Sequence, residues 1–273
     1  MIQPVVVPKV LVAPLDWGLG HATRCIPIIR ALLSAGCKVI LAGDSKVKAV
    51  LQPEFPLLRF LHLPGYQIQY ASTSWGLPFK IVAQIPRLLS VIKKEEQWLN
   101  KIVEEEGLNA VISDNRYGLR HSKIKSIFIT HQLLIKVPVK VAEELLQQFN
   151  YLYINRFDDC WVPDGEEEIA LAAALSHPVK KPAVPLQYVG ALSRFTWKEG
   201  RKEKHLLIIL SGPEPQRTLL EKIVVNDLKN YTAPVVLVRG LPQTTEKISV
   251  AANIVVYNHL PSIDLEEKML EAS

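Results

Sequence analysis

The chain has 273 residues, of which 48% are hydrophobic and 22% are charged, a composition that fits a globular protein of one large or two medium domains. The net charge of +5 is compatible with anionic ligands or an anionic membrane surface, whereas nucleic acid is disfavoured because zinc-finger spacing, aromatic RNA-binding motifs and long Lys/Arg runs are absent from the sequence. The chain has three isolated cysteines, Cys25, Cys37 and Cys160, which predict reduced thiols in a cytoplasmic protein. The sequence shows neither a signal-peptide pattern nor an apolar run of membrane-spanning length, which agrees with this prediction.

Strands and helices alternate along residues 1–190, which predicts a parallel sheet with helices on both faces. The first strand is expected at 10–15, and a helix follows because Ile26, Ile29 and Leu33 recur at helical spacing. Further strands are expected at 38–42, 57–61, 110–113, 126–130, 160–163 and 187–189. Helices are expected at 78–106, with Pro86 as a point of breakage, and at 139–153.

Residues 191–204 are polar and charged and lack periodicity, so we interpret them as a linker between an N-terminal domain at 1–190 and a second domain at 205–273. The second domain repeats the pattern, with strands at 206–210, 234–238 and 253–257 and helices near 218–229 and 262–272. A crossover helix must lead into a further parallel strand. We therefore expect the sequence to be part of a longer protein whose second domain is incomplete here.

The most informative loop joins the first strand to the first helix and reads Asp16-Trp17-Gly18-Leu19-Gly20-His21. Gly18 and Gly20 let the backbone approach a ligand closely, and the start of the helix offers unpaired N–H groups to an anion. His21 can take a proton near neutral pH. In an open α/β sheet this loop lies at the carboxyl edge, where ligands bind.

Several motifs, in order along nearly the whole chain, resemble those of the GT-B glycosyltransferases and, among these, the MurG-like group (glycosyltransferase family 28). The similar segments are 16–24, Thr130-His131-Gln132, 188–191, 210–217 and 257–261. The segment 210–217, which corresponds to the second glycine loop of the family and is called the second loop here, departs from it, since it has one glycine and two prolines where the family has more glycines. The resemblance implies an α/β fold of two tandem Rossmann-like domains, the second incomplete, with the acceptor on the N-terminal domain and the nucleotide sugar on the C-terminal one.

The resemblance implies a hexosyltransferase that moves a sugar from a UDP-sugar to a hydroxyl of a glycan or lipid-linked acceptor of the cell envelope. Inversion at the anomeric carbon and no need for a metal or other cofactor are also implied, and the sequence offers no obvious Asp-x-Asp pair. Two alternatives stay open. The run 18–25 also resembles UDP-sugar hydrolases of nonulosonic acid biosynthesis, in which the histidine would activate water. A non-catalytic nucleotide-sugar-binding module also fits, because the donor domain is incomplete and the chain as given can be inactive.

Glycosyl transfer requires a base for the acceptor hydroxyl, groups that neutralise the departing diphosphate, and an aligned acceptor. We predict that His21 is the base and that Asp16 orients it, because an imidazole can take a proton near pH 7 and a carboxylate can strengthen it. A helix-capping role for His21 and a turn role for Asp16 are the simpler alternatives. For Arg24, a solvated position on the first helix is favoured over a phosphate contact.

Other loops supply the predicted binding groups. The donor phosphates are expected on Gly18, Gly20, Ser211, Gly212 and Arg217. The acceptor is expected at the carboxyl ends of the fourth and fifth strands, on Asp114, Asn115, Arg116 and His131. A polar turn at 114–116 and a partly buried histidine at 131 are the alternatives.

Residues 75–94 are aromatic, apolar and basic together. Such a segment can lie on an anionic bilayer, and the family's corresponding region is associated with the membrane and a lipid-linked acceptor. Peripheral contact with the inner face of the membrane is therefore one hypothesis for this segment. An ordinary helix that extends its lysines into water is favoured over it, because this helix must also cover the sheet.

Overall fold

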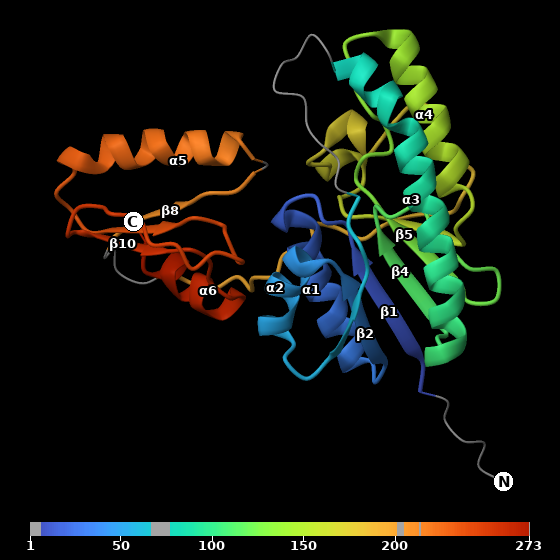
Figure 1. The fold of residues 1–273 in the computed structure, drawn as a ribbon, viewed down its shortest axis with the longest axis horizontal. Coiled ribbons are helices and arrows are strands. Elements are labelled where there is room, and N and C mark those ends of the chain that lie inside the picture. The colour runs from blue at the N-terminus through green and yellow to red at the C-terminus, as the bar shows by residue number, and fades with distance from the viewer. Residues whose placement is uncertain (1–6, 67–76, 201–204, 213, 273) are drawn as a thin grey trace.

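The computed structural model describes residues 7–66, 77–200, 205–212 and 214–272, with the side chains of 77–85 outside the description. The chain forms an α/β protein with two parallel sheets, a large one and a small one, that lie in separate parts of the molecule (Figure 1). This architecture confirms the predicted α/β class with two Rossmann-like units. The exact division at 190 and 204 stays a prediction.

The large sheet has seven parallel strands in the order β3-β2-β1-β4-β5-β6-β7. Their bounds are β1 (Lys9–Pro14), β2 (Lys38–Gly43), β3 (Arg59–His62), β4 (Ala110–Asp114), β5 (Lys125–Ile129), β6 (Asp159–Val162) and β7 (Leu186–Tyr188). The chain adds strands to one side of β1 first and then, from β4 on, to the other side. The loops after β1 and β4 therefore diverge and leave a crevice at the carboxyl ends of these two strands.

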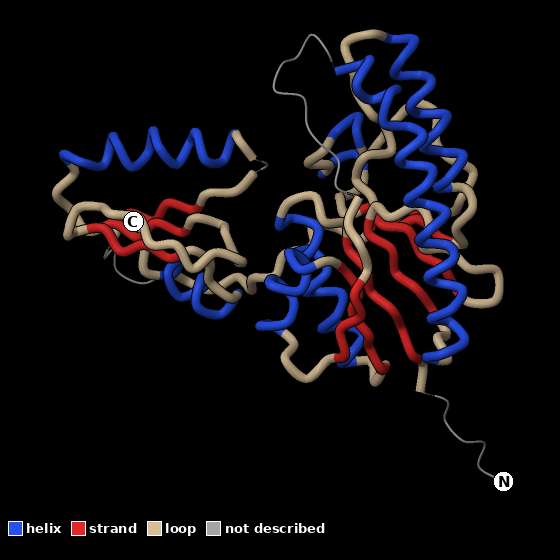
Figure 2. The backbone as a smooth tube through the Cα atoms, in the orientation of Figure 1, coloured by secondary structure: helices blue, strands red, loops and turns tan. Residues whose placement is uncertain are grey.

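Side chains alternate along β1 between two cores. Val10 and Val12 pack with α1 (Leu19–Ser34) and α2 (Ser45–Glu54), whereas Leu11 and Ala13 pack with Leu99 and Ile102 of α3 (Leu77–Glu106). A fourth helix, α4 (Lys140–Ile154), covers β5 and β6 next to α3. Helices thus cover both faces of the sheet (Figure 2). The chain stays helical through Pro86, so the expected break there is wrong.

The small sheet has three parallel strands, β8 (Leu206–Ile209), β9 (Val235–Val238) and β10 (Ile254–Tyr257), in the order β10-β9-β8. The alternate side chains of β9 again separate two cores. Val235 and Leu237 pack with Val224 of α5 (Gln216–Asp227), and Val236 and Val238 pack with Leu265 of α6 (Ser262–Leu270). The two helices therefore lie on opposite faces of the sheet (Figure 1).

The helices and strands predicted from the sequence occur in the structure with ends that differ by roughly two residues or less. One helix, α2, was not predicted. Its start carries a recognisable signal, because the Asp44 carboxylate accepts hydrogen bonds from the backbone N–H groups of Lys46 (3.0 Å) and Val47 (2.9 Å). Val47, Val50 and Leu51 form its buried face.

A carboxylate at the end of α2 connects the helices of the large sheet to α6 of the small sheet. The side chain of Glu54 is only 7% exposed and accepts hydrogen bonds from Nη2 of Arg30 (3.0 Å) and from the backbone N–H of Ser262 (2.5 Å), the first residue of α6. A negative charge is stabilised at a helix N-terminus by the free N–H groups and the helix dipole. Arg30 also donates to the carbonyl oxygen of Arg194 (3.0 Å), so this contact includes the connecting segment.

Replacing Glu54 by glutamine should loosen α6 without disturbing the large sheet. We expect hydrogen exchange of the first amides of α6 to become about fivefold faster, the factor that corresponds to about 1 kcal/mol for a charge at a helix N-terminus. Peptide-resolved hydrogen exchange measures this. Glu96→Gln is the matched control, because Glu96 pairs with Arg156 away from the small sheet. Equal exchange in both variants would contradict the role of Glu54.

Candidate active site

Two side chains meet at the crevice between β1 and β4. Gly18 precedes α1 with a φ of +70°, a conformation that favours glycine, and it turns the chain so that His21 lies in the first turn of the helix. Asp114 is the last residue of β4 and its side chain is 0% exposed. Nδ1 of His21 lies 2.9 Å from Oδ1 of Asp114. The fold therefore forms a histidine–carboxylate pair from positions 93 residues apart.

Arg24, one helical turn beyond His21, connects the groups of this cluster. Its Nε donates to Oδ2 of Asp114 at 2.6 Å, and its Nη2 contacts Oδ1 of the same carboxylate. Nη2 also lies 2.7 Å from Nδ1 of His21, and Nη1 lies 2.9 Å from Nδ1 of His131. The solvated position expected for Arg24 from the sequence is wrong, because its side chain is only 13% exposed and pairs with Asp114. The signal was available, since residues three apart share a helix face.

The charges of the cluster keep Asp114 ionised. Burial raises the pKa of Asp114, but the guanidinium of Arg24 and the contact with His21 outweigh it and hold the pKa below its usual value. Asp114 is therefore a carboxylate at neutral pH, and we assign the proton of neutral His21 to Nδ1, where this buried anion accepts it. Nε2 of His21 is left with a lone pair and has no partner among the described residues.

Asp16 does not contact His21. Its Oδ1 accepts the backbone N–H of Tyr66 at 3.0 Å, and Gly65 lies so close that a Cβ there would be 2.2 Å from Oδ2. Asp16 thus fastens the segment that follows β3 to the end of β1. The expected partner role of Asp16 is corrected by the structure, which places Asp114 beside the imidazole instead.

Arg116 is also placed differently from the acceptor-binding role predicted for it. It is fully buried, donates from Nε to Oε1 of Glu95 at 2.7 Å, and donates to the carbonyl oxygens of Pro14 and Pro64. Burial raises the pKa of Glu95, and Arg116 and three hydrogen bonds oppose that rise. This pair supports the fold from within, so we do not retain Arg116 as a ligand.

Asn115 and His131 remain at the carboxyl edge. Asn115 adopts a φ of +57°, which asparagine tolerates better than most residues, and its backbone N–H donates to the carbonyl of Ile129 (3.1 Å). His131 follows β5 and is partly exposed. Both residues are therefore available to a ligand in the crevice.

Two adjoining cavities lie between the sheets, with volumes of about 690 Å³ and 410 Å³. Both are lined by Trp17, Gly18 and Leu19 of the first loop and by Gly212 and Gly240 of the small sheet. Ser211 and Gly20 line the smaller cavity, and Lys46 and Arg217 line the larger. The predicted phosphate-binding residues thus line one or both of two adjoining spaces, each of the size that small-molecule ligands occupy. The side chains of His21, Asp114, Asn115 and His131 belong to neither lining.

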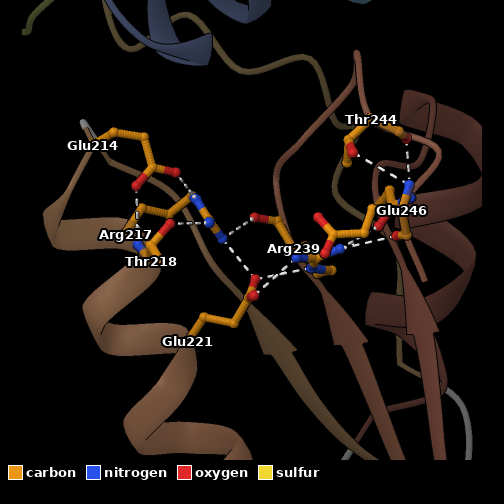
Figure 3. Close-up of polar contacts among 8 residues, drawn as sticks. Glu214, Arg217, Thr218, Glu221, Arg239, Thr244 and Glu246 are labelled. Atoms are coloured by element: carbon orange, nitrogen blue, oxygen red, sulfur yellow. Dashed lines mark hydrogen bonds and ion pairs between the residues drawn. The ribbon is translucent and has the colours of Figure 1, made fainter. Parts of the chain in front are cut away.

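The arginine of the second loop is not a free cation. Arg217 is buried and donates from Nε to Glu214 (2.6 Å), from Nη1 to Glu221 (2.7 Å) and from Nη2 to Thr218 (2.6 Å) (Figure 3). Glu221 also accepts two bonds from Arg239, both of 2.9 Å. The arginines and glutamates therefore neutralise one another, and Arg217 shapes the cavity wall with its charge already paired.

Glu214 places a negative charge at the start of α5. Its carboxylate accepts the backbone N–H of Thr218 (3.2 Å) as well as Nε of Arg217, while its side chain stays 52% exposed. Burial raises the pKa of Glu214, but the bonds from Thr218 and Arg217 outweigh it and lower the pKa. One of the N–H groups at this helix start, a position that binds anions well, thus already contacts a carboxylate of the chain itself.

Within the described ranges, no group of three or more histidine, cysteine, aspartate and glutamate side chains is arranged to hold a metal ion. None of the described helices has the length and apolar character needed to cross a membrane. Of the segment 75–94 that was predicted to touch a membrane, residues 75–76 and the side chains of 77–85 lie outside the described residues. Peripheral contact therefore stays a prediction.

No protein-family model and no curated protein sequence matches the chain. The structure is similar to the kitacinnamycin glycotransferase (TM-score 0.57, 16% identity, 94% of this chain and 72% of that one) and to the glycosyltransferase SnogD from Streptomyces nogalater (0.52, 14%, 93% and 72%). It is also similar to a UDP-N-acetylglucosamine 2-epimerase (0.50, 12%, 97% and 73%). The fold is therefore GT-B, and these similarities do not single out the MurG-like group.

The placement of Arg116 predicts a stability effect. Arg116→Met should lower the free energy of unfolding by about 3 kcal/mol, because it leaves the Glu95 carboxylate buried without its cation. Arg59→Met is the control, since Arg59 is 64% exposed beside Glu106 and should cost less than about 1 kcal/mol. Urea denaturation measures both values. Equal effects would show that the buried pair is dispensable.

Proposed function

We propose that the protein transfers a sugar from a UDP-sugar to a hydroxyl acceptor, with inversion and without a metal. One observation carries the proposal: the His21–Asp114 pair lies at the carboxyl edge of the large sheet, and the helix residues on either side of His21, Gly20 and Ala22, line cavities that the glycine loop of the small sheet completes. The GT-B fold supports it, since that fold forms its site between two such sheets. A fold alone does not define an activity, so the side chains must carry the chemistry.

In the proposed step, Nε2 of His21 removes the proton from the acceptor hydroxyl as the hydroxyl oxygen attacks the anomeric carbon. The bond between this carbon and the diphosphate oxygen breaks on the opposite face, and its electron pair leaves with UDP, which inverts the centre. His21 becomes an imidazolium, and the adjacent Asp114 carboxylate stabilises the new charge. Arg24 keeps Asp114 ionised throughout.

The departing diphosphate needs positive partners, and backbone N–H groups can supply them. We assign this role to the N–H groups around Gly212, the Ser211 hydroxyl, and the start of α1 at Gly18 and Gly20. The first turn of α1 carries no acidic residue and has no side-chain cap, so its N–H groups can face a phosphate. Arg217 would contribute to the shape of the site, since its own charge is paired.

The acceptor side of the proposal consists of Asn115 and His131, which lie beside the His21–Asp114 pair at the same edge. Two further parts of the proposal rest on the sequence alone. They are a glycan or lipid-linked acceptor, and contact of residues 75–94 with an anionic membrane. Flotation with anionic liposomes at low and high salt tests the membrane contact, and absence of binding would exclude it.

A second candidate, a UDP-sugar hydrolase, uses the same base on water. The observation that favours it is the similarity to a UDP-N-acetylglucosamine 2-epimerase, because the name of that enzyme mentions a UDP-sugar and no acceptor alcohol. Release of UDP from UDP-glucose, UDP-galactose and UDP-N-acetylglucosamine, with and without alcohols, separates the candidates. A transferase releases UDP faster with an acceptor, whereas a hydrolase frees the sugar at an unchanged rate. Tight binding of UDP without any turnover would favour a binding module.

Substitution of the catalytic pair should abolish most turnover. We expect His21→Ala to lower kcat about a thousandfold, and Asp114→Asn about a hundredfold, because the first removes the base and the second removes the charge that orients it. Release of UDP measures both rates, with thermal denaturation as the check on folding. His62→Ala is the control on an exposed histidine. Turnover that survives in a folded His21→Ala variant would refute the assigned base.

The position of Glu214 predicts an effect on donor affinity. Since its carboxylate already contacts the start of α5, Glu214→Gln should bind UDP about fivefold more tightly by removing a like charge near the diphosphate. Titration calorimetry compares it with wild type and with Glu267→Gln, an exposed glutamate of the same sheet unit. Unchanged affinity would contradict the competition, whereas no UDP binding by any form would contradict the assigned donor site.

A further inference from the structure

The guanidinium of Arg24 joins two imidazoles at the carboxyl edge of the large sheet. Its Nη2 lies 2.7 Å from Nδ1 of His21, and its Nη1 lies 2.9 Å from Nδ1 of His131. For His21 a carboxylate competes for the same nitrogen, because Oδ1 of Asp114 lies 2.9 Å away. Among the described residues, Nδ1 of His131 has a hydrogen-bond contact with Arg24 alone. Both rings therefore contact Arg24 on Nδ1, but only Nδ1 of His21 also contacts a carboxylate.

The carboxylate fixes where each proton lies. An arginine side chain carries only donors, so Nδ1 of His131, which contacts Arg24 alone, must accept and the proton of the neutral ring is on Nε2. At His21, Nη2 of Arg24 donates to Oδ1 of Asp114, and we assign the Nδ1 proton to the same carboxylate. The 2.7 Å approach of Nη2 to Nδ1 of His21 is then not a hydrogen bond, and the lone pair of His21 is on Nε2. The Nε2 atoms of the two rings thus have opposite hydrogen-bonding character.

The surroundings keep His131 neutral. Burial lowers its pKa, and the positive charge of Arg24 on α1 lowers it further, as a proton on the second ring nitrogen of His21 also would, whereas Asp114 of β4 and Asp164 beyond β6 act in the opposite direction. Asp164 is itself buried, and its charge is spread over bonds from the Ser176 hydroxyl and three backbone N–H groups. The direction is therefore set by burial and by Arg24.

We propose that Arg24 is a positioning residue that fixes His131 as a neutral donor, so that the acceptor is gripped by two imidazoles of opposite polarity. His21 accepts the proton of the reacting hydroxyl, and Nε2–H of His131 donates to a second oxygen of the same molecule. Nε2 of His131 has no partner in the described part of the chain and is free to do so. The acceptor class this selects is a molecule with neighbouring hydroxyls, such as a sugar, and this last step rests on the proposed function.

Nitrogen NMR of the imidazoles tests the tautomer without any substrate. In the wild type, His131, assigned with His131→Gln, should carry its proton on Nε2 at pH 7 and titrate below the usual pKa of about 6.5. Arg24→Met should raise that pKa and mix the two tautomers, while the exposed His62 stays unchanged as the internal control. A wild-type His131 that is protonated on Nδ1, or charged at pH 7, would overturn the proposal even if the variant does not fold.

A matched pair of alcohols tests the second contact. With UDP-glucose, UDP-galactose or UDP-N-acetylglucosamine as donor, trans-1,2-cyclohexanediol should exceed cyclohexanol about tenfold in kcat/KM, as expected for one added hydrogen bond. His131→Leu should reduce this preference toward the statistical factor of two equivalent hydroxyls, and His131→Gln, which keeps an N–H donor, should restore most of it. An unchanged preference in His131→Leu overturns the second contact. If neither alcohol is glycosylated, the proposed transferase fails and the NMR result still decides the tautomer.

Discussion

The structure depends on one buried charge, the carboxylate of Asp114 at the end of β4. An ionised group removed from water costs several kcal/mol, and only good hydrogen-bonding partners offset that cost. Arg24, His21 and the Cys25 thiol supply them, and all three lie in the first two turns of α1. The carboxylate therefore fixes α1 against β4, and with it the shape of the glycine loop that precedes the helix.

Helix α1 consequently makes three kinds of contact along its length. Its apolar side, with Ala22, Cys25, Ile26 and Ile29, fills the core against β1, and its start places His21 and Arg24 at the crevice. Farther along, Arg30 binds Glu54, whose carboxylate meets the first N–H of α6. A displacement of α1 would therefore change the core, the proposed base and the contact with the small sheet together.

The fold could be predicted from the sequence because periods of 2 and 3.6 residues are local and Gly18 and Gly212 mark the loops. The partner of His21 could not, since Asp16 is its neighbour in sequence, whereas Asp114 becomes its neighbour only through the order of the strands. Arg116 was assigned to a ligand because nothing local indicates that Glu95, on a distant helix, neutralises it. The pair of Arg217 with Glu221 could be read from their i, i+4 spacing. The cap of α2 could also be read, because an aspartate, Asp44, directly precedes the helix.

The polar groups of the two sheets differ in how their charges are paired. At the large sheet, one nitrogen of each imidazole has no partner among the described residues, while at the small sheet Arg217 and Arg239 are neutralised by Glu214 and Glu221. A diphosphate at the second loop would thus meet backbone dipoles rather than a free cation, and dipoles fixed by a rigid loop need no reorganisation when the negative charge develops. The paired arginines contribute that rigidity. Arg217 bonds to the carbonyl oxygen of Arg239, and Arg239 bonds to Glu221 of α5 and to the carbonyl oxygen of Glu246, so α5, the end of β9 and the loop after it form one network.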